Sequence, residues 1–96
     1  MSNRNYANGR AAEYRVVKIL EATGYTVVRS AGSHGCADVI AWNTQGLRLI
    51  QVKRGVAHAS PLEWAQFAEL PVPPGTVKEI WEFRKPRHPP VVRVVA

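Results

Sequence analysis

Asp38, Gln51 and Lys53 are the residues whose types and spacing best suit chemistry on a phosphate group. Apolar runs on either side of the turn-like sequence 43–46 predict a β-hairpin. In the register set by that turn, Asp38 faces Gln51 across the ladder. Because side chains alternate between the two faces of a strand, Lys53 shares the face of Gln51. The sequence therefore predicts a carboxylate, an amide and an ammonium group side by side at the open end of the hairpin.

Glu13 is a further acid with an unexpected position. It lies inside the apolar stripe of a predicted helix, because apolar residues follow it three, four and seven positions further along. A buried carboxylate is costly unless it is paired or binds a metal. If this helix packs on the hairpin, Glu13 can reach Asp38. Two carboxylates and an amide oxygen suit Mg²⁺ or Mn²⁺, and Lys53 could stabilise an attacked phosphate or orient the attacking water.

Each of these residues also has a simpler interpretation. The open end of the hairpin could meet solvent, with Asp38 and Lys53 forming a surface pair of small energetic value. Glu13 could be an acid in the first turns of a helix, where the helix dipole favours it. Two features favour a site instead: Asp38 is the single aspartate of the chain, and Glu13 does not lie on the solvent face of its helix.

The elements that must position these residues follow from periodicity and turn signals. Ser60, Pro61 and Glu63 form a complete helix start with a capping box. The last strand is apolar on both faces and must pair within the sheet or across a subunit boundary. The expected elements are a helix over 7–23, strands over 25–29, 37–42 and 47–53, a helix from 60 to about 70, and strands over 77–84 and 91–95.

Length, charge and composition restrict the protein class. Its 96 residues predict a single domain over 1–96, and the net charge of +6 favours a polyanion partner, with nucleic acid first and an anionic membrane second. One cysteine excludes an internal disulfide framework. No apolar run approaches the ~20 residues that span a bilayer. We expect a cytoplasmic protein, prokaryotic or viral in an infected cell, with no membrane partner and no small-molecule substrate.

Four short motifs resemble those of the archaeal-type Holliday junction resolvases, in the P-D-(D/E)-x-K nuclease superfamily. The resemblance runs from about Asn8 to Arg54. It implies an α/β, restriction-endonuclease-like fold, with an α-β-β-β-α-β-β core and a mixed central sheet flanked by helices. The motifs are Ala12-Glu13, the stretch V-V-R-S-A-G-S over 27–33, Ala37-Asp38-Val39, and Gln51-Val52-Lys53.

The resemblance implies roles for the residues of the predicted metal site. Glu13 and Asp38 correspond to metal ligands, and Lys53 matches the motif lysine. Gln51 stands where the family usually has glutamate, which removes one negative charge and should weaken metal binding. Its carbonyl oxygen can still ligate, so we expect Gln51 to complete the ligand set with Mg²⁺ or Mn²⁺.

DNA contacts are also implied by the resemblance. Arg29 and the loop over 30–33 correspond to a DNA-contacting and catalytic loop, in which Ser33, or Ser30 as the alternative, assists the cut. His34 is interpreted as a phosphate contact or a plain loop residue. Tyr14 replaces an arginine that the resolvases often have. The expected DNA-binding residues are Arg10, Arg15, Arg29, Ser30, His34 and Arg54.

The function predicted on these grounds is that of a crossover junction endodeoxyribonuclease. It would act as a homodimer on branched double-stranded DNA and cleave four-way junctions by metal-dependent phosphodiester hydrolysis. One alternative is a nuclease of the same fold that acts on other branched or damaged DNA. Another is a non-catalytic DNA-binding module in which Gln51 marks a decayed site.

Overall fold

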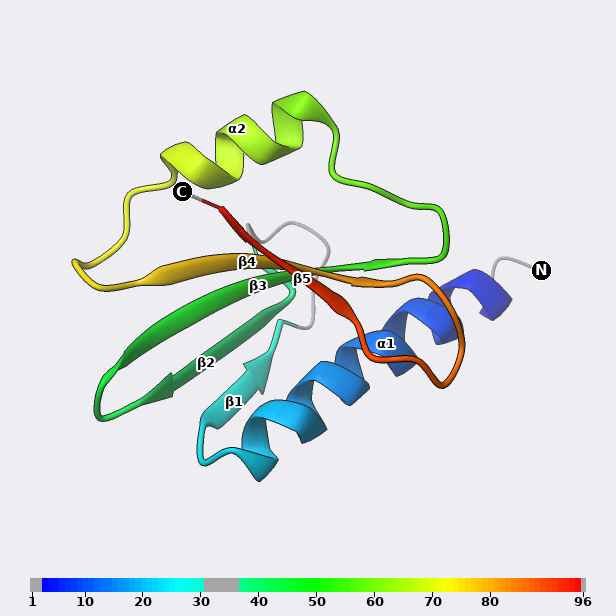
Figure 1. Cartoon of the computed structure of the whole chain (residues 1–96), viewed down its shortest axis with the longest axis horizontal. Helices are drawn as coiled ribbons and strands as arrows, with labels where there is room; N and C mark the ends of the chain where they lie inside the picture. The colour runs from blue at the N-terminus through cyan, green and yellow to red at the C-terminus, as the bar shows by residue number, and fades with distance from the viewer. Residues whose placement is uncertain (1–2, 31–36, 96) are drawn as a thin grey trace.

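The computed structural model describes residues 3–30 and 37–95 and confirms the predicted order of elements (Figure 1). A five-stranded mixed sheet lies between two helices, so the predicted α/β fold class is correct. The elements are α1 (Asn3–Ala22), β1 (Thr26–Arg29), β2 (Val39–Asn43), β3 (Gly46–Arg54), α2 (Pro61–Glu69), β4 (Val77–Phe83) and β5 (Val91–Val95).

The sheet has the strand order β1-β2-β3-β4-β5 and is antiparallel except between β3 and β4. Parallel neighbours need a crossover connection, and the segment that contains α2 supplies it. The predicted hairpin register is confirmed by the pairs Trp42–Leu47 and Ile40–Leu49. The Asn43 side chain fixes the turn by accepting hydrogen bonds from the amides of Gln45 at 2.8 Å and Gly46 at 3.1 Å.

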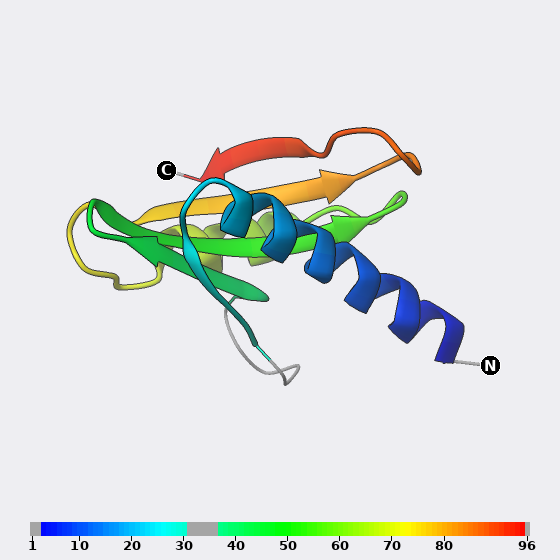
Figure 2. The same ribbon diagram turned by 90° about the horizontal axis from the view of Figure 1, so that it is seen from below.

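Each helix covers one face of the sheet, as Figure 2 shows. Ala12, Val16 and Leu20 recur every fourth residue of α1, so they form one stripe that packs against the sheet. Alternation along β3 sends Ile50 to this stripe and Leu49 to the opposite side, where Phe67 of α2 covers it. The face under α2 therefore also carries Gln51 and Lys53, which have the same parity as Leu49.

The start of α2 has the predicted capping box. Ser60 Oγ accepts from the Glu63 amide at 3.1 Å, and Glu63 Oε1 accepts from the Ser60 amide at 2.9 Å. The hydrogen bond from the Ser60 backbone, followed by the charge of Lys53, lowers the pKa of Glu63 below its ordinary value of 4.5. The box therefore fixes an ionised carboxylate close to the end of β3.

Three charged residues of β4 are buried, which the sequence does not predict. Glu79 accepts from Arg48 at 2.7 Å and from the Trp81 indole at 2.9 Å. Lys78 Nζ donates to two carbonyl oxygens at the end of α2, each at 2.7 Å. Glu82 accepts from Arg84 and Arg93. Each buried charge thus has a partner, as the low dielectric of a core requires.

Two element boundaries differ from the predictions by more than one residue. The first helix starts at Asn3 instead of about residue 7, and β2 starts at Val39 instead of residue 37. The second difference arises at Asp38, which interrupts the strand. Across the described ranges 3–30 and 37–95, neither helix is both long and apolar enough to span a membrane.

Candidate active site

Asp38 lies where the ladder between β2 and β3 ends. Regular pairing stops at Val39–Ile50, and the Asp38 amide also donates to Ile50 O at 2.9 Å. Two successive residues therefore meet one residue of the partner strand, as at a β-bulge. Packing agrees, because Ala37 belongs to the cluster under α2 whereas Val39 belongs to the cluster under α1. The predicted ladder pair between Asp38 and Gln51 is therefore wrong, because the alternation of side chains breaks at Asp38.

The bulge gives the Asp38 carboxylate a defined position between the two strands. Its Oδ2 accepts from the Val52 amide of β3 at 2.8 Å, and the side chain is half-buried. The Asp38 carbonyl accepts from the Ser30 amide at 2.8 Å, which ties the end of β1 to the same point. A backbone hydrogen bond fixes the carboxylate but leaves it acceptor capacity for a cation. Asp38 thus lies next to the residue between Gln51 and Lys53.

Lys53 is held by α2. Its Nζ lies 3.4 Å from Oε2 of Glu63, with the Lys53 side chain 21 % exposed and the Glu63 side chain 48 % exposed. Such a partly exposed pair contributes little stability, so its main effect is on position. The contact holds the Lys53 ammonium on the α2 side of β3, on the face that Gln51 shares. The sequence identified the Glu63 cap, but not its contact with Lys53.

Glu13 belongs to α1, which covers the face of the sheet opposite Lys53. Its Oε1 accepts from Arg29 Nη1 at 3.0 Å, and both side chains are about one-fifth exposed. The Arg29 guanidinium also lies 4.9 Å from the centre of the Tyr14 ring. The hydrogen bond to Glu13 raises the pKa of Arg29 above its ordinary value. The prediction that Glu13 needs a partner is confirmed, and in the part of the chain that is described this partner is Arg29.

Arg29 links Glu13 to the neighbourhood of Asp38. Arg29 pairs with Val39 in the β1–β2 ladder, one residue from Asp38. The structure therefore gathers Asp38, Gln51 and Lys53 around the ends of β2 and β3, and connects Glu13 to them through Arg29. Ser30 joins this group through its backbone. Ser33 and His34, the other predicted loop residues, lie outside the described residues.

The predicted metal ligands offer a suitable but incomplete donor set. Within 3–30 and 37–95, no group of three or more His, Cys, Asp or Glu side chains could hold a metal ion. The carboxylate of Asp38 and the amide oxygen of Gln51 are both hard donors of the type that Mg²⁺ prefers. Glu13 would be a third, but Arg29 neutralises it in this structure.

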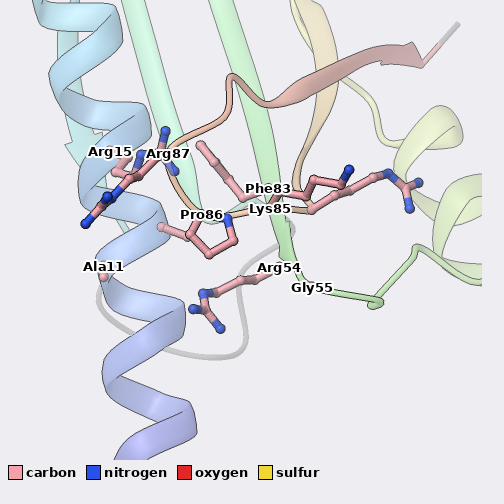
Figure 3. A pocket seen from close by; sticks show the side chains of 10 residues that line it. Ala11, Arg15, Arg54, Gly55, Phe83, Lys85, Pro86 and Arg87 are labelled. Carbon is pink, nitrogen blue, oxygen red and sulfur yellow. The ribbon is translucent and has the colours of Figure 1, made fainter.

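The remaining predicted DNA-binding arginines divide into two groups. Arg10 is exposed on α1, three residues before Glu13. Arg15 and Arg54 line a separate cleft between α1 and the connection from β4 to β5 (Figure 3). The sequence predicts all three arginines as DNA-binding residues, but it does not indicate that Arg15 and Arg54 share a cleft of their own.

Two comparisons with known proteins bear on this arrangement. Residues 4–68, more than half of the chain, match the family described as archaeal Holliday junction resolvase (Hjc). The fold is similar to that of a solved structure, the Hjc Holliday junction resolvase of the archaeal hyperthermophile Archaeoglobus fulgidus. That match has a TM-score of 0.72 and 24 % identity, and covers 92 % of this chain and 73 % of the other. Because the matched segment contains the whole arrangement from Glu13 to Lys53, the chain belongs to the archaeal Holliday junction resolvase family.

Proposed function

We propose that this protein cleaves four-way DNA junctions as a metal-dependent endonuclease. The observation that carries the proposal is the position of Asp38, whose carboxylate is fixed by the Val52 amide between the two residues that supply an amide oxygen and an ammonium. Membership of the Hjc family supports a junction as the substrate. The net charge of +6 suits a polyanionic substrate.

In this proposal, Asp38 and Gln51 hold a divalent cation such as Mg²⁺ or Mn²⁺. When bound, such an ion lowers the pKa of a water molecule and polarises the phosphate. Asp38 would contribute the only formal charge of this pair, because Gln51 is neutral. We therefore expect a weaker metal affinity than a site with two carboxylates would have, and cleavage that requires a higher metal concentration.

Lys53 would act on the phosphate directly. An ammonium group that is already in place can stabilise the negative charge that grows on the phosphate oxygens, or orient the attacking water. The contact with Glu63 at 3.4 Å limits where the ammonium can move. Its flexible stem still lets the ammonium move from the partly exposed Glu63 to a DNA phosphate.

Glu13 and Arg29 would change partners when substrate and metal are present. Arg29 compensates the charge of Glu13 in the free chain. With a cation nearby, Glu13 needs this compensation less, and Arg29 becomes available to a DNA phosphate. Arginine suits this exchange because its planar group binds carboxylate and phosphate in similar ways.

A homodimer is part of the proposal. β5 is an edge strand, and it exposes Val91, Val92 and Val94, the last with 64 % of its surface accessible. Exposed apolar edge strands are prone to pair with another chain. Two copies would also provide two cleavage sites, as symmetric resolution of a junction requires. Sedimentation velocity on the protein, with and without junction DNA, tests this part.

The competing function is a DNA-binding module without nuclease activity, favoured by the amide at Gln51. The variant Gln51→Glu separates the two. If the site is active, the variant should cleave at lower Mg²⁺ concentration than the wild type, because the added charge strengthens metal binding. If neither protein cleaves at any metal concentration while both bind the junction, the chain is a binder.

A panel of DNA substrates tests the choice of substrate. Four-way junctions, three-way junctions, nicked duplex and linear duplex of equal length are incubated with the protein and Mg²⁺. The proposal predicts cleavage of the four-way junction, with paired cuts on opposite strands, and little cleavage of linear duplex. Equal cutting of all four substrates would contradict it.

A further inference from the structure

We propose that the cleft between α1 and the β4–β5 connection binds a DNA phosphodiester next to the one that is cut. The inference extends the proposed function, because it concerns the same DNA molecule. It assigns a second anchoring point, which lies on the α1 side of the sheet, away from Gln51 and Lys53. Its ligand class is a phosphate of the nucleic-acid backbone.

The cleft is basic and has a suitable size. It has a volume of about 580 Å³, and its lining contains no acidic residue. Figure 3 shows Arg15 and Arg87 on one side of Pro86 and Arg54 on the other. Lys85 also contributes to the lining. Like charges that share one cleft repel each other, and a bound anion removes this repulsion.

One cation of the cleft, Arg15, forms contacts that connect the elements lining it. Arg15 Nη2 donates to the carbonyl of His88 at 3.2 Å, and the Arg15 guanidinium lies 4.6 Å from the centre of the Phe83 ring. These contacts join α1 to the end of β4 and to the β4–β5 connection. The walls are thus held together before any ligand arrives, which reduces the ordering cost of binding.

Three further cations of the cleft have no acidic partner among the described residues. In the described part of the chain, no carboxylate forms an ion pair with Arg54, Lys85 or Arg87. Arg84 also lines the cleft, but its guanidinium bonds to Glu82 at 2.8 Å. Guanidinium groups bind phosphate oxygens through planar, forked hydrogen bonds. Arg54 and Arg87 thus offer such groups with no carboxylate partner among the described residues.

Backbone geometry also points to Arg87. Its φ of 62° makes it the one non-glycine residue with positive φ among residues 3–30 and 37–95. Asparagine or glycine adopts this conformation more readily than arginine does. Arg87 therefore occupies a position where the backbone favours glycine or asparagine, and its side chain lines the cleft.

Two consecutive residues at the end of β3 connect the candidate active site with the cleft. Lys53 and Arg54 are consecutive, so their side chains leave the strand on opposite faces. Lys53 contacts α2, whereas Arg54 lines the cleft beside α1. A DNA strand that passes the end of β3 could meet Lys53 at the phosphate to be cut and Arg54 at a neighbouring one.

The test measures how the affinity for DNA depends on salt. A fluorescent four-way junction is titrated with the protein in EDTA, where no cleavage occurs, at several salt concentrations. Arg87→Asn suits the backbone at that position, and Arg54→Gln removes the second charge. Each variant should reduce the magnitude of the slope of log K against log salt by about 0.9, the value for one lost phosphate contact.

Two controls separate this effect from a general loss of charge or of folding. Lys18→Gln removes one exposed charge of α1 that does not line the cleft, and it should leave the slope unchanged. Arg54→Lys keeps the charge and should retain the wild-type slope. Thermal unfolding midpoints of all variants confirm that the proteins are folded under the conditions of the titration.

The outcomes distinguish this inference from the proposed function. The cleft does not bind phosphate if the slopes of Arg87→Asn and Arg54→Gln equal that of the wild type. The same conclusion follows if their slopes fall no further than that of the control Lys18→Gln. Tighter binding of an RNA duplex than of the junction would also overturn the inference. If the wild type binds junction and linear duplex equally and cuts neither, the proposed function fails, while the slopes still report on the cleft.

Discussion

The candidate active site and the basic cleft use charged residues in different ways. In the active site, Arg29 pairs with Glu13 and Lys53 pairs with Glu63. In the cleft, neither Arg54 nor Arg87 pairs with a carboxylate of the described residues. Partly exposed ion pairs contribute only about 0–1 kcal/mol, so the pairs of the active site act mainly by fixing positions.

The difference has a chemical consequence. A cation that must act at one defined phosphate is best held in place by a neighbouring acid. A cation that only anchors the DNA backbone needs no acidic neighbour and can remain solvated until a phosphate binds. The two regions are therefore expected to respond differently to substitution: the first in the rate of cleavage and in stability, the second in DNA affinity.

The largest expected effect concerns the neighbours Lys53 and Arg54. Lys53→Met should lower the single-turnover cleavage rate at saturating protein by about 100-fold, because it removes charge stabilisation at the reacting phosphate. Arg54→Gln should lower the same rate by less than about tenfold, because saturation compensates for weaker binding. Quenched-flow cleavage of a labelled junction measures both rates. If both variants lost the same fraction of the cleavage rate, the active site and the cleft would not differ in the way proposed.

A smaller effect is expected on stability. Arg29→Gln removes the ion pair with the half-buried Glu13 and should lower the free energy of unfolding by about 1 kcal/mol. Arg54→Gln breaks no internal ion pair and should stay within about 0.5 kcal/mol of the wild type. Urea unfolding followed by tryptophan fluorescence gives both values. A larger loss in Arg54→Gln would mean that Arg54 has a structural role.

Glu63 has two roles, one in the capping box and one in the ion pair with Lys53, and two substitutions separate them. Glu63→Ala removes the hydrogen bond from the Ser60 amide to Glu63 Oε1, which is one half of the capping box, and should lower the free energy of unfolding by about 1 kcal/mol. Glu63→Gln keeps an acceptor for the Ser60 amide and should lower it by less. Both variants lose the ion pair with Lys53. If that pair positions Lys53, both should show the same modest loss of cleavage rate despite their different unfolding midpoints in urea.

The smallest expected effect is the dependence of stability on pH. Burial acts to raise the pKa of Glu82, but hydrogen bonds from Arg93 and Arg84 outweigh it, so the pKa lies below 4.5. The pKa of Glu63 is also lowered. A carboxylate whose pKa is lower in the folded than in the unfolded state stabilises the fold at pH values above its unfolded pKa. This stabilisation is lost as the pH falls through the folded pKa. Urea midpoints between pH 6 and pH 3 should fall less steeply in Glu63→Gln and Glu82→Gln than in the wild type.

Local sequence signals were sufficient for much of the fold. Asn43 sets the turn, and the hairpin register follows from it, because each residue fixes the position of the next along a ladder. Ser60 and Glu63 define the start of α2 through contacts within four residues. Such features depend on neighbours in the sequence and can be predicted without knowing how the elements pack.

The side-chain partners of the site could not be predicted in this way. Glu13 meets Arg29 only because α1 packs on the face of the sheet opposite Lys53. Asp38 leaves the ladder because its carboxylate replaces a backbone acceptor for the Val52 amide. Both contacts depend on how separate elements pack or on a local break in regular pairing. Residue spacing pointed to Glu13 and Asp38, and the family resemblance pointed to Arg29, but the contacts of these residues required the structure.

The most direct test of the central claim is the cleavage of a four-way junction by wild type and Asp38→Asn over a range of Mg²⁺ concentrations. The account predicts paired cuts by the wild type that require Mg²⁺. It predicts a loss of at least about 100-fold in Asp38→Asn, while binding of the junction in EDTA is retained. Cleavage by Asp38→Asn at the wild-type rate, or wild-type cleavage that persists in EDTA, would contradict a metal site built on Asp38.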